Sequence, residues 1–388
     1  MKLASRLERV KPFYVMELME RARRHEMAGH EIIHMEVGEP AYPTAAAIAR
    51  AGREAIDRGD TRYTPATGLP ALRERIAGYY RTLDVDVDPE RVLITSGASG
   101  GLMLLAAALL DPGDDILVTD PGYPCNEAFA EAVGAHARRV PVYADTRFQP
   151  QWADLLAHWS ERTRGVLLAS PSNPTGSMLG RSELEAIVQG VRGRGFLILD
   201  EIYQGLVDDD PPYRSVLQLA DDPIVLQSFS KYFGMTGWRL GWVVVPEVMI
   251  AGMRTLAQNL FISPSTVAQH AALAAFGEEA MAEHERRRLQ FMRRMSHLSQ
   301  GLEQCGLVVP VRPQGAFYVY ADVSSSGLTA SEFSQRLLDD FHVAATPGAD
   351  FGSVDAERYV RFACTVDLPV LDEVIRRVGV AVRRYRGD

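Results

Sequence analysis

Two basic residues of the 388-residue chain stand where charge is costly, and both could take part in chemistry. Lys231 comes four residues after the apolar run at 224–227, and it is the only lysine beyond residue 11. Arg361 stands inside the apolar stretch at 359–363. A buried cation is stable only when it is paired or chemically used. Lys231 is therefore the one interior candidate for amine chemistry, and Arg361 is expected to bind a carboxylate of the protein or of a ligand.

Small and polar residues follow three further apolar runs. The glycine- and serine-rich segment at 96–101 opens into a helix, whose N-terminus favours an anion. Asp200 ends the run at 196–199, and a proline-containing segment at 170–176 follows another run. Each feature also has a plain structural interpretation, because glycine and serine often begin helices, aspartate caps them and proline stiffens turns. Taken one at a time, these features leave the alternatives open.

The elements that must position these residues alternate along the chain from about residue 90 onward. Short apolar runs bounded by Gly, Pro, Ser or Asp are typical of strands buried on both faces. We predict an α/β fold, with a mostly parallel central sheet and helices on both faces, plus a smaller α+β domain. Ligands bind beyond the carboxyl ends of such strands. The predicted strands are 92–95, 116–119, 166–169, 196–199, 224–227 and 240–245, with a helix at 102–110.

The pattern changes after about residue 280, where a long charged helix leads to isolated strands. We read this as a second domain that the N-terminal arm completes. The predicted parts are an N-terminal arm with part of the small domain at 1–45, a large domain at 46–285 and a C-terminal small domain at 286–388. Within them we expect an amphipathic helix at 15–29 and strands at 316–320 and 359–363.

Composition and charge exclude several classes of protein. The net charge of −9 repels nucleic acid, and the arginines at 286–288 and 293–294 are expected on a solvated helix face. No apolar run approaches the roughly 20 residues that span a bilayer, and the N-terminus lacks a signal-peptide pattern. The three cysteines are far apart and form no C-x-x-C pair, which suits a reducing compartment. We therefore expect a cytoplasmic protein without nucleic-acid or membrane partners.

Five motifs resemble those of class I/II aminotransferases of pyridoxal 5′-phosphate (PLP) fold type I, the aspartate aminotransferase-like family. The resemblance runs from about residue 10 to the C-terminus, with the motifs in matching order and spacing. It implies a PLP-dependent aminotransferase, or transaminase, of amino-acid metabolism. The motifs are TRYTPATGLPALR (61–73), ASPSNPTG (169–176), FLILDEIY (196–203), SFSKYFGMTGWRLGW (228–242) and GAFYVYAD (315–322).

The resemblance also implies a role for each matching residue. Lys231 would hold PLP as a Schiff base and shuttle the substrate Cα proton, while Asp200 would keep the ring nitrogen protonated. Tyr203 and Asn173 would hydrogen-bond the 3-oxygen of the ring. Tyr123 would stack on the ring. The phosphate would be held by Arg239, Ser228, Ser99 and the backbone of Gly97 and Ala98.

The same resemblance implies how substrate and partner bind. Arg361 would grip the substrate α-carboxylate, with help from Gly38 and Asn173. Tyr63 resembles a tyrosine that reaches the phosphate from the partner subunit, which implies a homodimer with shared active sites.

Relatives that are specific for dicarboxylates bind the second carboxylate with a cation, either in the phosphate-binding loop, which matches 96–101 here, or in the segment that matches 259–266. In this sequence the loop has Ser99, and the segment 259–266 carries no charge. The N-terminal segment expected to cover the site includes Phe13, Tyr14 and Val15. We therefore predict a neutral, small or hydrophobic L-amino acid donor such as alanine, or a broad range. The predicted acceptor is 2-oxoglutarate or pyruvate.

One segment matches a zinc-binding motif but is not expected to bind metal. The segment His30-Glu31-Ile32-Ile33-His34 matches the H-E-x-x-H zinc-protease pattern, which requires a helix. Gly29 is expected to end a helix here, and the following isoleucines lead into a strand, where the two histidines would stand about 13 Å apart. No metal site is therefore expected.

Three alternatives compete with the predicted activity. An aspartate aminotransferase and a PLP-dependent carbon–sulfur β-lyase share the same cofactor residues, so motifs separate them poorly. A non-enzymatic ligand sensor on this fold would normally carry an appended DNA-binding segment, and the chain is expected to begin too close to the fold for one. The presence of Lys231 with the full set of cofactor residues also favours an enzyme.

Overall fold

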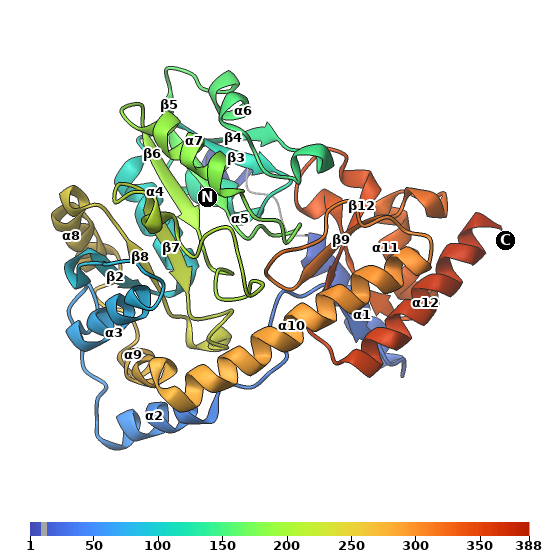
Figure 1. Ribbon diagram of the computed structural model, residues 1–388, viewed down its shortest axis with the longest axis horizontal. Helices are drawn as coiled ribbons and strands as arrows, with labels where there is room; N and C mark the ends of the chain where they lie inside the picture. Colours follow the sequence, from blue (N-terminus) through green and yellow to red (C-terminus); the bar gives the residue numbers. More distant parts are fainter. Residues whose placement is uncertain (9–13, 388) are drawn as a thin grey trace.

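The computed structural model describes residues 1–8 and 14–387 of the chain (Figure 1). Its central sheet has seven strands in the order β2-β8-β7-β6-β5-β3-β4. Strand β8 is antiparallel to both neighbours and the other pairs are parallel, so the sheet is mostly parallel as predicted. The strands are β2 (Val92–Thr95), β3 (Asp115–Asp120), β4 (His136–Pro141), β5 (Thr163–Ala169), β6 (Phe196–Asp200), β7 (Ile224–Ser228) and β8 (Gly241–Val244).

Helices cover both faces of this sheet because alternate strand residues are apolar on each side. In β6, Leu199 packs into one hydrophobic cluster and Ile198 into the other. Burying each such side chain contributes roughly 1.5–3 kcal/mol. Helices α4 (Gly97–Leu109), α5 (Cys125–Ala132) and α8 (Ile250–Leu260) cover the Ile198 face. The opposite face is covered by α2 (Ala46–Asp57), α3 (Pro70–Arg81), α6 (Trp152–Ala157), α7 (Arg181–Val191) and α9 (Thr266–Leu273).

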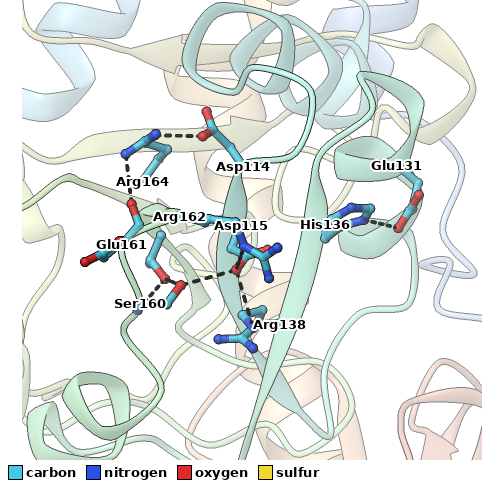
Figure 2. Close-up of polar contacts among 10 residues, drawn as sticks. Asp114, Asp115, Glu131, His136, Arg138, Ser160, Glu161, Arg162 and Arg164 are labelled. Atoms are coloured by element: carbon cyan, nitrogen blue, oxygen red, sulfur yellow. Dashed lines mark hydrogen bonds and ion pairs between the residues drawn. The ribbon is translucent and has the colours of Figure 1, made fainter.

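Two elements of the sheet region differ from the sequence prediction. Helix α4 begins at Gly97 rather than at residue 102, so the glycine-rich segment forms its first turn. Strand β4 was not predicted, because its sequence HARRVP is polar. It lies at the edge of the sheet, and Figure 2 shows the ion pairs that its side chains His136 and Arg138 form with Glu131 and Asp115. The carboxylate of Asp115, 1% exposed, lies 3.4 Å from the guanidinium groups of Arg138 and Arg162.

A second group of elements packs around the C-terminal half of helix α10 (Glu278–Gln304), which runs beside both parts of the molecule (Figure 1). Strand β1 (Ile33–His34) pairs with β10 (Val343–Ala344), so the N-terminal segment joins this group. The proposed division at 285/286 falls inside α10, and the domain boundaries stay a prediction. The other members are α1 (Tyr14–Met27), α11 (Ala330–Phe341), α12 (Leu368–Arg386) and the sheet of β11 (Thr346–Pro347), β12 (Tyr359–Ala363) and β9 (Tyr318–Asp322).

The prediction of a solvated arginine face on α10 is wrong for two residues. Arg287 and Arg294 are only 6% and 3% exposed. The two guanidinium carbons each lie 5.1 Å from the ring centre of Tyr42. Arg287 also pairs with Glu283 over 2.6 Å, and Arg294 pairs with Asp367. The helical pattern did not reveal this arrangement because Tyr42 and Asp367 come from distant segments. None of the described helices combines the length and the apolar character that a membrane span needs.

Candidate active site

The carboxyl ends of the parallel strands open into a cavity of about 360 Å³. Residues from the strand ends form its floor, and helix α1 and the β9–β12 sheet contribute the remaining walls. Most of the residues singled out in the sequence meet here. Those that line the cavity are Gly38, Ala98, Ser99, Tyr123, Asn173, Asp200, Tyr203, Ser228, Lys231, Arg239 and Arg361.

Lys231 and Asp200 are brought to this cavity by neighbouring strands. Asp200 is the last residue of β6, and Lys231 follows the end of β7. The Lys231 Nζ donates a hydrogen bond of 2.5 Å to the Gly38 carbonyl oxygen. Burial, together with the positive charge of Arg361, lowers the pKa of this amine to about 8. A lysine with a lowered pKa is more readily available as a nucleophile and base near neutral pH.

Asp200 is 5% exposed, and burial raises the pKa of its carboxyl group to about 7. The backbone N–H of Ile202 donates to its Oδ1 over 3.0 Å, and the charge of Lys231 also favours the ionised form. A cationic ligand atom beside this carboxylate would restore its negative charge. This property fits an acid that pairs with a protonated ring nitrogen of PLP.

Arg361 is a buried cation that no carboxylate of the described residues contacts directly. It is 5% exposed, and it forms no ion pair with any residue that the structure describes. One guanidinium nitrogen donates to Asn173 Oδ1 over 2.9 Å, and a second donates to the backbone oxygen of Glu36. The Nε atom has no partner. A ligand carboxylate would satisfy this group, as the sequence predicted for Arg361.

A cradle for an anion lies at the start of helix α4. Gly97 has φ +74°, and a Cβ at this position would lie 2.7 Å from a guanidinium nitrogen of Arg239. Glycine therefore leaves room for Arg239 beside the first helical turn, which also contains Ala98 and Ser99. The helix N-terminus and the guanidinium group together favour an anion. The buried Ser228 completes the wall, and this set of groups fits the phosphate of PLP.

Several predicted residues remain untested or lie elsewhere. Tyr63 is 81% exposed and does not line the cavity, so its role toward a partner subunit stays a prediction. Phe13 lies outside the described residues. Tyr123 lines the cavity, and burial raises its pKa. The individual roles of the cofactor residues likewise stay predictions, although the structure brings them to one cavity.

The H-E-x-x-H segment does not form a helix. Helix α1 ends at Met27, and His34 lies in strand β1. The His30 ring stacks on His342 with 4.4 Å between ring centres, whereas His34 bonds to Glu36 over 2.7 Å. Over residues 1–8 and 14–387, no group of three or more His, Cys, Asp or Glu side chains is placed to hold a metal ion.

The sequence reasoning missed several residues of the cavity wall. Tyr318 is buried, and its hydroxyl lies 2.8 Å from that of Tyr203. Its place in the motif GAFYVYAD was a signal that could have identified it. Met16, Met19 and Asp350 also line the cavity, and no local pattern marks them.

The chain is similar to known aminotransferases in both sequence and structure. The family model described as "Aminotransferase class I and II" matches residues 30–378. The valine–pyruvate aminotransferase of Mycobacterium tuberculosis is 37% identical, over 95% of this chain and 96% of the relative. An aspartate aminotransferase of Pyrococcus horikoshii is 32% identical, over 98% of this chain and 97% of the relative. The crystal structure of an aminotransferase from M. tuberculosis superposes with a TM-score of 0.94 and 36% identity, over 99% of this chain and 100% of that one.

Proposed function

The chain belongs to the class I and II aminotransferase family and is a PLP-dependent transaminase, and from this premise we propose that its amino donor is a neutral, small or hydrophobic L-amino acid. The proposed acceptor is a 2-oxo acid such as pyruvate or 2-oxoglutarate. Bound PLP supplies an electron sink for the charge that develops at the substrate Cα.

We propose that the chain's own residues act as follows. Lys231 would hold the cofactor covalently and, once the substrate has released the lysine amine, would take up and return the proton of the substrate Cα. Asp200 would pair with the protonated ring nitrogen. Arg361 and Asn173 orient the substrate through its α-carboxylate, which places the Cα–H bond near the Lys231 amine. The 2.9 Å contact between Arg361 and Asn173 supports a joint role for them.

One observation carries the choice of a neutral donor. The cations of the described cavity wall are Lys231, Arg239 and Arg361, and each has a proposed partner in the cofactor or the α-carboxylate. No cation of this wall is left for a second substrate carboxylate. The remaining wall is largely apolar, with Val15, Met16, Met19 and Ile202. The similarity to a valine–pyruvate aminotransferase supports the same choice, and the similarity to an aspartate aminotransferase keeps that alternative open to test.

We also propose a homodimer with shared active sites, working in the cytoplasm. Tyr63 is 81% exposed, and the Thr266 hydroxyl donates to the Arg62 carbonyl over 2.6 Å, so the segment of Tyr63 meets the start of helix α9. The exposed Leu260, Phe261 and Ile262 precede that helix in the chain. An apolar surface of this kind suits a second copy of the chain. The three cysteines are free, which supports a reducing compartment.

A donor panel tests the proposed function. The purified enzyme with PLP is assayed with alanine, valine, leucine, methionine and aspartate against pyruvate and against 2-oxoglutarate. We expect the neutral donors to give the highest kcat/KM. A kcat/KM for aspartate that exceeds those of the neutral donors by about tenfold would contradict the proposal. Release of pyruvate from a thioether amino acid without a 2-oxo acid would instead indicate the β-lyase.

A further inference from the structure

One charged residue of the cavity wall has no role in the function proposed above. Four charged residues of the wall have a proposed role. Asp200 and Lys231 would bind the cofactor ring, Arg239 its phosphate, and Arg361 the substrate α-carboxylate. The other two charged residues are acidic. Glu36 is fully buried, and its Oε1 lies 2.7 Å from the Nδ1 of His34, which neutralises it. The remaining charge is Asp350.

Asp350 lies between Arg361, the proposed partner of the substrate α-carboxylate, and the apolar part of the wall. The next residue, Phe351, places its ring centre 4.7 Å from the guanidinium carbon of Arg361. On the other side, the Asp350 Oδ1 accepts a 2.7 Å hydrogen bond from the backbone N–H of Tyr14, the first residue of helix α1. The next residues of this helix, including Met16, line the cavity. An amino acid whose α-carboxylate bonds to Arg361 would therefore lie beside this part of the wall.

The start of α1 offers no free attraction to a ligand carboxylate. The Asp350 carboxylate already accepts from the backbone N–H of Tyr14 and interacts with that of Val15. The positive end of the helix is thus directed at a protein carboxylate rather than at the cavity. Burial raises the pKa of Asp350, while the N–H of Tyr14 and the charge of Arg361 favour its ionised form. Among the cations of the described wall, Arg361 is therefore the one that acts on Asp350, and a bound α-carboxylate would engage it.

We propose that Asp350 is a specificity-determining residue that repels a second carboxylate on the substrate. Like charges brought together in a partly buried site disfavour binding, which is a common means of rejecting a wrong substrate. Donor and acceptor occupy the same cavity in turn, so the rejection applies to both. The substrates are therefore monocarboxylates, and the acceptor is of the pyruvate type rather than 2-oxoglutarate. This inference rests on the proposed transaminase function.

The first test uses the wild-type holoenzyme with alanine or leucine as donor. We expect kcat/KM for pyruvate, or for another monocarboxylate 2-oxo acid, to exceed that for 2-oxoglutarate by about tenfold or more. Equal use of the two acceptors would overturn the inference and leave the transaminase function intact. Failure to transaminate any pair would instead overturn the proposed function itself.

The second test uses Asp350→Asn, which keeps an oxygen that can accept from Tyr14 but removes the charge. The ratio of kcat/KM for aspartate to that for alanine should rise by about tenfold, mainly through a lower KM for aspartate. Asp355→Asn is the matched control, because Asp355 belongs to the following turn, pairs with Arg358 over 3.5 Å and does not line the cavity. That control should leave the ratio unchanged. An unchanged ratio in a folded Asp350→Asn enzyme would overturn the inference, and the wild-type acceptor test decides the matter if the variant does not fold.

Discussion

The hydroxyl groups of Tyr203 and Tyr318 lie 2.8 Å apart at the wall of the active-site cavity. Tyr203 follows strand β6 of the large sheet, whereas Tyr318 begins strand β9 of the second sheet. Tyr318 also sits against Gly38, where a Cβ would lie 2.1 Å from the tyrosine hydroxyl oxygen. One hydrogen bond and one close packing contact therefore bring together three segments that are remote in sequence.

Removing the Tyr318 hydroxyl tests this relationship. In Tyr318→Phe, the buried Tyr203 hydroxyl loses its partner, which costs roughly 1–3 kcal/mol of interaction. We expect the pH midpoint of the absorbance change of bound PLP to shift, and kcat/KM to fall by about tenfold. The measurement is a spectrophotometric pH titration of the holoenzyme. An unchanged midpoint would show that Tyr318 does not act through Tyr203.

Replacement of the single interior lysine tests the covalent role of Lys231. Lys231→Ala should abolish turnover, because no other lysine lies beyond residue 11. PLP should still bind without a covalent bond, since the cradle at Gly97 and Arg239 remains. Activity assays combined with reduction by borohydride and mass spectrometry check both points. Full activity in this variant would remove the assignment.

Arg361 is predicted to bind the substrate α-carboxylate. Arg361→Gln should raise KM and lower kcat/KM by about a hundredfold, which corresponds to the loss of a charge-assisted contact of roughly 3 kcal/mol. Arg358→Gln is a matched control, because the Arg358 side chain is 51% exposed and pairs with Asp322. Its kinetic constants should stay close to those of the wild type. Unchanged kinetics in Arg361→Gln would mean that the carboxylate binds elsewhere.

The pair of His34 and Glu36 predicts a pH dependence of stability. The hydrogen bond to the buried Glu36 raises the pKa of His34 to about 9, from an ordinary value of 6.5. The raised pKa means that the stabilisation is fully present below about pH 6.5 and is lost as the pH rises through about 9.

The free energy of unfolding of the wild type should therefore exceed that of His34→Gln most at pH 6.5, and the difference should shrink toward pH 10. Urea unfolding at several pH values measures it. His297→Gln is the control, because His297 pairs with a solvent-exposed Asp372 and should contribute less than about 1 kcal/mol. A constant difference between wild type and His34→Gln across this range would argue against the charged pair.

Local sequence patterns determined the fold class and which residues follow each strand. Each buried strand of a parallel sheet carries a continuous apolar run that ends in small or polar residues, so the residue pattern by itself places Asp200 and Lys231 at one edge of the sheet. Strand β4 was not predicted, because an edge strand stabilised by ion pairs lacks the apolar run that marks a buried strand.

Only the tertiary structure decided which distant residues touch. Arg287 and Arg294 have the local pattern of a solvated helix face, yet both are buried against Tyr42. Asp350 meets Tyr14 across 336 positions of the chain, and neither residue carries a local mark of that contact. Periodicity and motif spacing reflect the conformation of a few neighbouring residues, whereas packing brings together side chains that no short segment contains.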